Sequence, residues 1–320
     1  MGTTTKRMKT IGYRFVRLDG DDREFETLLK AALRKLRTAD SRFYHPSNDE
    51  RMVRFINGSH MTRGALCGDY LAYEHGAAAQ LVRIAAGADT LPVASYESPS
   101  GNEFVGGMLL WAVAGNHMVV MQSATVRSGD FERYLNWLLG HAGLMVDGAS
   151  LALEHRMTKA ALSIVQRNPV RDIKLKLPLF AAHRSPSANP KREEISFERT
   201  VAADMLSQLL GPNELRRMGI EKAAAANLRL DIRVHYDRTT DAAGEAVLRR
   251  LASVLSRGDN IGEDNLEIEI AGVGRVIKGD ELRLETSIPV QHRDGNPMIH
   301  DAFQEMVSYL QQLVESEFLG

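Results

Sequence analysis

The chain of 320 residues carries a formal net charge of −1 at pH 7, and 44% of its residues are hydrophobic and 25% charged. This composition is typical of a globular protein of one or two domains, and it excludes a globally basic nucleic-acid-binding protein. The single cysteine, Cys67, excludes an internal disulfide and a cysteine-based zinc site, and the lack of long apolar runs excludes a membrane-spanning helix. Because the N-terminal residues also lack the apolar segment of a signal peptide, we expect a cytoplasmic location.

The first third of the chain is expected to consist mainly of β-strands. An amphipathic helix is predicted over residues 23–38, where apolar residues recur every three or four positions. We expect Trp111 and Cys67 to be core residues. Apolar or alternating segments separated by glycines predict strands over residues 11–18, 52–56, 65–73, 81–85, 103–114 and 117–122.

The middle of the chain is its most regular part and predicts the order strand, helix, strand, helix, strand. Ser128 is expected to start the first of these helices and Thr158 to cap the second. The five elements are predicted over residues 117–122, 128–140, 150–156, 159–166 and 172–179.

The last of these strands, with the sequence DIKLKLPL, has one apolar and one basic face. Its isoleucine and leucines point one way, and Lys174 and Lys176 point the other way, because successive side chains of a strand lie on opposite faces. This pattern predicts a strand that packs on a core and presents its lysines to a partner.

The segment after this strand is expected to be an exposed, mobile loop. It contains two prolines, small polar residues and the basic residues Arg184, Lys191 and Arg192. Helices are predicted to follow over residues 197–210 and 213–225, and together with the loop they form a smaller lobe.

Strands and helices alternate in mixed order through the last third of the chain. Strands are predicted over residues 228–236, 266–273 and 281–290, and helices over residues 241–256 and 298–318. The strands at 266–273 and 281–290 flank the turn Lys278-Gly279-Asp280, which predicts that they form a hairpin.

The mixed order of elements predicts an α+β fold with a mostly antiparallel β-sheet body, packed helices and a smaller helical, mobile lobe. We expect a β-rich globular domain over residues 1–184, the basic loop and helical lobe over 185–227, and an α+β portion over 228–320 that completes the globular body.

Motifs for enzymatic chemistry are weak. The chain has no phosphate-binding loop, no dinucleotide-binding fingerprint and no nucleophile elbow, and its ten histidines show no metal-ligand spacing. We therefore expect no catalytic residue, no metal and no cofactor. The enzymatic alternative is a metal-dependent nuclease, built from Glu267, Glu269 and Glu285 with Lys278 nearby.

A local excess of basic residues is the remaining functional signal. Residues 156–199 contain ten Lys or Arg residues against four acids. If the strands at 172–179 and 228–236 are neighbours, their outward basic side chains converge and can contact phosphates without reading base sequence. The alternative is a solvated basic face that acids elsewhere balance, or a pure protein-interaction scaffold. The candidate DNA-binding residues are Lys174, Lys176, Arg184, Lys191, Arg192, Arg233 and Arg238.

The chain from residue 115 onward resembles the RexA-like phage-exclusion proteins of bacterial anti-phage defence. The resemblance lies in the run GNHMVVMQSATVRSGDFERYLNWLLG, in KLPLF at 176–180, and in LRLDIRVHYDR at 228–238 followed by a helix. It extends through a hairpin and a long terminal helix, and so covers about two thirds of the chain in pattern. The helix after Arg238 departs from the family, because it contains fewer lysines.

The resemblance implies a cytoplasmic homodimer that binds double-stranded DNA with low sequence specificity and has no catalytic activity of its own. It also implies a role in abortive-type anti-phage defence, with a membrane or toxic effector protein encoded nearby as a partner.

Overall fold

The computed structural model describes residues 4–46, 50–82, 93–146, 148–178, 180–185, 194–199, 229–235, 243–257, 265–271 and 275–315. Within these ranges every strand pairing is antiparallel, and helices pack on two of the sheets. The predicted α+β fold with mostly antiparallel sheet is therefore confirmed.

The largest sheet has eight strands and is organised around the long first strand, β1. Its strand order is β16-β15-β1-β7-β6-β3-β2, and β8 also pairs with β1. The first part of β1 pairs with β15, whereas its last part, from Phe15 onward, pairs with β8. The bounds are β1 Thr4–Asp19, β2 Met52–Thr62, β3 Ala65–Glu74, β6 Val105–Ala114, β7 His117–Gln122, β8 Ser150–Glu154, β15 Glu285–Arg293 and β16 Asn296–Pro297.

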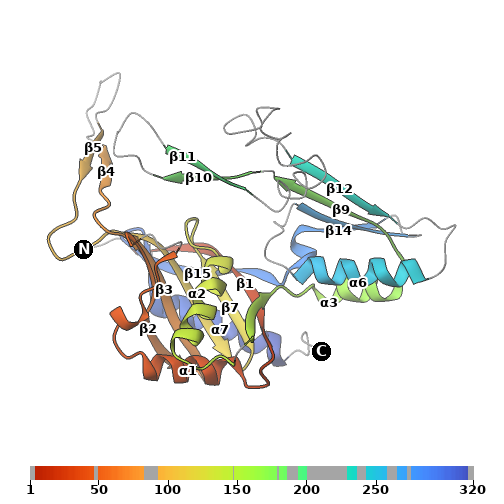
Figure 1. Ribbon diagram of the computed structural model, residues 1–320, viewed down its shortest axis with the longest axis horizontal. Coiled ribbons are helices and arrows are strands. Elements are labelled where there is room, and N and C mark those ends of the chain that lie inside the picture. The colour runs from red at the N-terminus through yellow and green to blue at the C-terminus, as the bar shows by residue number, and fades with distance from the viewer. Residues whose placement is uncertain are drawn as a thin grey trace.

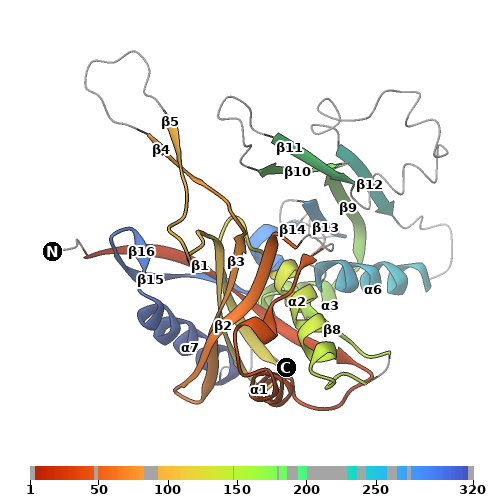
Figure 2. The same cartoon turned by 60° about the vertical axis from the view of Figure 1, so that its left-hand side comes forward.

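Helices cover both faces of this sheet (Figures 1 and 2). Helices α1 (Phe25–Lys35) and α2 (Ser128–His141) pack on one face and α7 (Ile299–Glu315) on the other. The two faces explain the nearly continuous apolar run of β6, since its alternate residues contribute to different cores. Trp111 faces α1 and α2 and is fully buried, as the sequence predicts. Cys67 faces α7 and is also fully buried, which raises the pKa of its thiol to about 11.

The second sheet has four strands in the order β12-β9-β13-β14. Helices α3 (Lys159–Arg167) and α6 (Ala243–Arg257) pack on one of its faces, where Ile173 and Ile268 meet Leu248 and Ala252. Thr158 caps α3 as predicted, because its hydroxyl accepts a hydrogen bond from the Ala161 backbone N–H at 3.2 Å. The bounds are β9 Val170–Pro178, β12 Arg229–His235, β13 Leu266–Ile270 and β14 Arg275–Lys278.

Two hairpins form small sheets of their own. Strands β4 (Ala79–Val82) and β5 (Val93–Tyr96) form one, and β10 (Phe180–Ser185) and β11 (Glu194–Arg199) form the other. The segment predicted as a loop after residue 180 therefore begins with a strand, β10. The helix predicted to start at residue 197 is wrong for residues 197–199, because they belong to β11, which pairs with β10. The rest of that helix and the helix predicted over residues 213–225 lie outside the described residues.

The hairpin predicted between residues 266–273 and 281–290 is wrong. Strand β13 pairs instead with the short β14 and with β9, whereas β15 pairs with β1 in the eight-stranded sheet. Between them, Gly279–Leu282 forms a 3₁₀ turn. Leu282 is buried in the core of the four-stranded sheet and Leu284 in the core under α7, so the chain crosses from one core to the other here rather than turning back.

The five α-helices of the described residues are amphipathic and of moderate length. The closing helix α7 has 17 residues and buries Phe303, Met306 and Leu310 against the sheet. No helix in the described part of the chain is both long and apolar enough to cross a membrane.

Candidate functional site

Helices α3 and α6 lie on one side of the four-stranded sheet (Figure 1). Strand β9 presents its two lysines on the opposite face, because Ile173 and Leu175, which alternate with them, belong to the core beneath these helices. The side chains of Lys174 and Lys176 are each 38% exposed, whereas Ile173 is fully buried. The alternation predicted from the sequence therefore holds. We refer to this face of β12, β9, β13 and β14 as the outer face.

The neighbouring strand β12 brings further basic side chains to the outer face. In the antiparallel register Arg233 lies opposite Lys174, and Asp231 lies opposite Lys176. Arg229 and Arg233 alternate with half-buried apolar residues along β12 and are exposed. Strands β9 and β12, whose pairing the sequence could not decide, are therefore hydrogen-bonded neighbours in the sheet.

Strand β13, on the other side of β9, carries acids to the same face. Lys176 Nζ lies 2.8 Å from Glu267 Oε1, and Lys174 Nζ lies 3.7 Å from Glu269 Oε2. The hydrogen bond with Glu267 raises the pKa of Lys176 above its ordinary value, and the same bond lowers that of Glu267. Both lysines are thus paired with carboxylates of the adjacent strand.

Arg233 is held more firmly than the lysines, because its guanidinium binds Asp172 with two hydrogen bonds of 2.8 and 2.7 Å. The Asp172 side chain is only 1% exposed, although it lies on the outer face, because Arg233 and Arg171 cover it. The hydrogen bonds from Arg233 hold the pKa of this carboxyl below its ordinary value, and the charge of Arg171 adds to the effect. Such two-point contacts are stronger than single lysine pairs.

The described part of the outer face is mixed in charge. Six basic side chains against four carboxylates leave a net charge of +2. Arg171 and Lys278 are not among the basic side chains that the sequence predicts to converge, because only the strand register places them beside the lysines. Arg229 is among those side chains but is not one of the seven candidate contacts. The basic residues are Arg171, Lys174, Lys176, Arg229, Arg233 and Lys278, and the acids are Asp172, Asp231, Glu267 and Glu269.

Three of the seven candidate DNA-binding residues therefore meet on one surface, namely Lys174, Lys176 and Arg233. Arg184 belongs to β10, whose backbone pairs with β11 in a separate hairpin. The remaining candidates, Lys191, Arg192 and Arg238, lie outside the described residues.

The structure does not bring together the three carboxylates that the nuclease hypothesis needs. Glu267 and Glu269 lie on β13, whereas Glu285 lies on β15 in the other sheet, with its Oε1 4.0 Å from Arg14 Nη1. Among the described residues, no three His, Cys, Asp or Glu side chains lie close enough together to hold a metal ion.

The fold and this surface define the protein as an antiparallel α+β protein with an exposed sheet face, and the described residues of that face are mixed in charge with a net positive sum. No known protein-family model matches the chain, and no curated protein is significantly similar to it.

Proposed function

We propose that the outer face binds the phosphate backbone of double-stranded DNA without sequence specificity and without catalysis. The observation that carries this proposal is the convergence of Lys174, Lys176 and Arg233 from two adjacent strands on an exposed face. The opposite face is packed on α3 and α6, so the basic side chains project from a rigid support. Contacts with phosphates fix a protein on a duplex but carry no base information.

The carboxylates of the outer face do not prevent this function. An exposed ion pair contributes about 0–1 kcal/mol to stability, so a phosphate can replace a carboxylate beside a lysine at low cost. The acids do reduce the net charge, and they limit how many cations are available to DNA at once. We therefore expect modest affinity, with a dissociation constant of roughly 10⁻⁴ to 10⁻⁶ M at physiological salt, as for other non-specific binding.

The biological setting of this proposal rests on the resemblance to the RexA-like phage-exclusion proteins. In that setting the protein is a cytoplasmic homodimer and a DNA-binding component of anti-phage defence. A membrane or toxic effector protein encoded nearby is its partner. A dimer would present two outer faces to one duplex and raise the overall affinity without any new type of contact.

The test is a fluorescence anisotropy titration of the full chain with duplexes of unrelated sequence, at low and at physiological salt. In the double variant Lys174→Gln/Lys176→Gln we expect roughly tenfold weaker binding to every sequence and a shallower salt dependence. The matched control is Lys6→Gln/Arg7→Gln, which removes the same charge from exposed positions of β1. Both residues belong to the first part of β1, and the labelled N-terminus, from which β1 starts, lies far from β9 and β12 in both views (Figures 1 and 2). The control should therefore leave affinity unchanged.

Three outcomes would contradict the proposal. Equal affinities of the folded double variant and the wild type would exclude β9 as the contact strand. DNA that is cut in the presence of Mg²⁺ would instead favour the nuclease effector. An absence of binding at both salt concentrations would leave the protein-interaction scaffold as the better explanation.

A further inference from the structure

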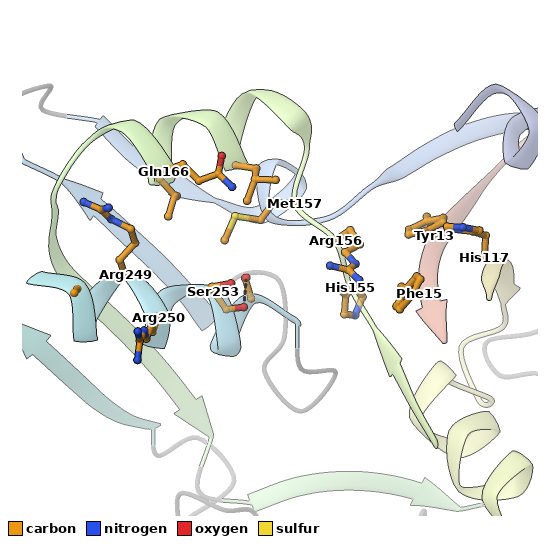
Figure 3. A pocket seen from close by; sticks show the side chains of 14 residues that line it. Tyr13, Phe15, His117, His155, Arg156, Met157, Gln166, Arg249, Arg250 and Ser253 are labelled. Carbon is orange, nitrogen blue, oxygen red and sulfur yellow. Dashed lines mark hydrogen bonds between the residues drawn. The ribbon is translucent and has the colours of Figure 1, made fainter. Parts of the chain in front are cut away.

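A cavity of about 680 Å³ lies between the eight-stranded sheet and the helices α3 and α6. Figure 3 shows its two ends. Arg249 and Arg250 of α6 lie at one end, and Tyr13, Phe15 and His117 of β1 and β7 lie at the other. The volume falls within the range of roughly 300–1,000 Å³ that is usual for small-molecule sites.

Among the described residues that line the cavity, the charged side chains are all basic. Three arginines line it, namely Arg156, Arg249 and Arg250, and no Asp or Glu is among its described lining residues. Arg249 is paired with Glu245 at 2.7 Å, but Arg156 and Arg250 have no ion pair with any described residue. A cavity with this lining attracts an anion, and the planar, forked guanidinium is suited to phosphate.

The end formed by β1 and β7 is aromatic, and Arg156 lies against it. Tyr13 Oη lies 2.7 Å from His117 Nδ1, and the guanidinium of Arg156 lies over the ring of Phe15 at 4.4 Å from its centroid. Burial and the charge of Arg156 lower the pKa of His117, so the imidazole is neutral at neutral pH. Burial raises the pKa of Tyr13, which therefore remains a phenol. Aromatic rings and guanidinium planes are the side chains on which nucleobases stack.

We propose that this cavity binds a nucleotide, with its base at the end formed by Phe15, His117 and Arg156 and its phosphates at Arg249 and Arg250. The cavity lies between two layers of the fold, and several of its lining residues are almost completely buried, among them Tyr13 and Ser256. It therefore suits a small ligand rather than a duplex. The inference is independent of the DNA-binding proposal, since the two surfaces share no residue.

The test is isothermal titration calorimetry of the full chain with ATP, GTP, AMP, adenosine and inorganic phosphate. We expect the nucleotides to bind more tightly than adenosine or inorganic phosphate, because only they use both ends of the cavity. The variant Arg250→Gln should weaken nucleotide binding by roughly 10- to 100-fold. Because Arg250 is exposed, the variant should keep the fold. The matched control Arg34→Gln, at an exposed position of α1, should bind as the wild type does.

A second variant tests the cavity without a change of charge. Ser253→Phe adds a ring on the α6 wall, and it should abolish nucleotide binding while the melting temperature shows that the protein is folded. No heat with any of the five compounds would overturn the proposal. Equal affinities for ATP and inorganic phosphate would also overturn it. So would ATP binding that is lost in Lys174→Gln/Lys176→Gln but retained in Arg250→Gln.

Discussion

Arg233 binds both carboxylate oxygens of Asp172, with Nε 2.8 Å from Oδ1 and Nη2 2.7 Å from Oδ2, across the β12–β9 pair. The pair joins the edge strand of the sheet to its neighbour through side chains as well as backbone. In the free protein, Asp172 thus already binds Arg233, which is one of the basic side chains that we propose to contact DNA. Asp172 therefore opposes DNA binding while it stabilises the fold.

The stability that Asp172 contributes should depend on pH. Because its pKa is lower in the folded than in the unfolded state, this contribution is complete above the unfolded value of about 3.9 and is lost as pH falls through the folded value. The variant Asp172→Asn should lose about 1 kcal/mol at pH 7 and show a smaller further loss in acid than the wild type. Urea unfolding at pH 7 and at several acid pH values measures both effects, and parallel acid losses in the two proteins would contradict the assignment.

Removing acids from the outer face should tighten DNA binding. The variant Glu267→Gln/Glu269→Gln raises the net charge of the described face from +2 to +4 and releases Lys174 and Lys176 from their partners. We expect roughly tenfold higher affinity at low salt and a steeper decrease in affinity with salt, since more cations meet phosphates. Anisotropy titration measures both. The control Glu50→Gln/Glu97→Gln changes the charge equally at exposed positions outside this sheet, and an equal gain there would show that only total charge matters.

A second ion pair, between Arg54 and Asp130, is important for the stability of the eight-stranded sheet. The Arg54 Nη1–Asp130 Oδ1 distance is 2.7 Å, and the two side chains are only 15% and 14% exposed. Asp130 also accepts hydrogen bonds from Arg133 and from the Arg127 backbone N–H at the start of α2. Burial alone would raise the pKa of Asp130, but the charge of Arg54 and the hydrogen bonds from Arg54, Arg127 and Arg133 together outweigh it, and the pKa is below its ordinary value.

Asp130→Ala should therefore destabilise the protein by about 2 to 3 kcal/mol, because it leaves a largely buried guanidinium without its carboxylate and removes a helix cap. Arg133, whose side chain is 67% exposed, provides the control, and Arg133→Ala should cost less than about 1 kcal/mol. Chemical denaturation measures the two free energies of unfolding. Similar small losses in both variants would show that the Arg54 pair is of little importance.

Several local elements could be predicted from the sequence to within a few residues, because their signals lie within the elements themselves. Strand β7 has the predicted bounds, α2 begins at Ser128, and α3 follows its cap, Thr158. The alternation of β9 likewise predicted which of its side chains are buried. In the strands the period of the apolar residues is the signal, and for α3 that period and the capping residue Thr158 agree.

Pairing between distant segments could not be predicted in this way. Strands β1 and β15 are neighbours although almost the whole chain separates them, and nothing in either sequence specifies the other as its partner. The same limit affected the functional site. The lysines of β9 could be assigned to an exposed face, but the acids that pair with them come from β13, about 90 residues further on. The charge balance of the face depends on a register that only the folded sheet defines.

Two glycines should respond in opposite ways to the same substitution. A Cβ atom on Gly68 in β3 would lie 2.3 Å from Trp111 Cζ2 and 2.5 Å from the backbone oxygen of Gly58, whereas a Cβ on Gly140 in α2 meets nothing within 4 Å. Gly68→Ala should cost roughly 1–3 kcal/mol or more, because both the fully buried indole and the backbone resist displacement. Gly140→Ala should stabilise the protein by about 0.5–1 kcal/mol, since alanine favours the helix. Paired urea denaturation curves measure the two changes, and a neutral Gly68→Ala would show that the β2–β3 register around Trp111 is looser than described.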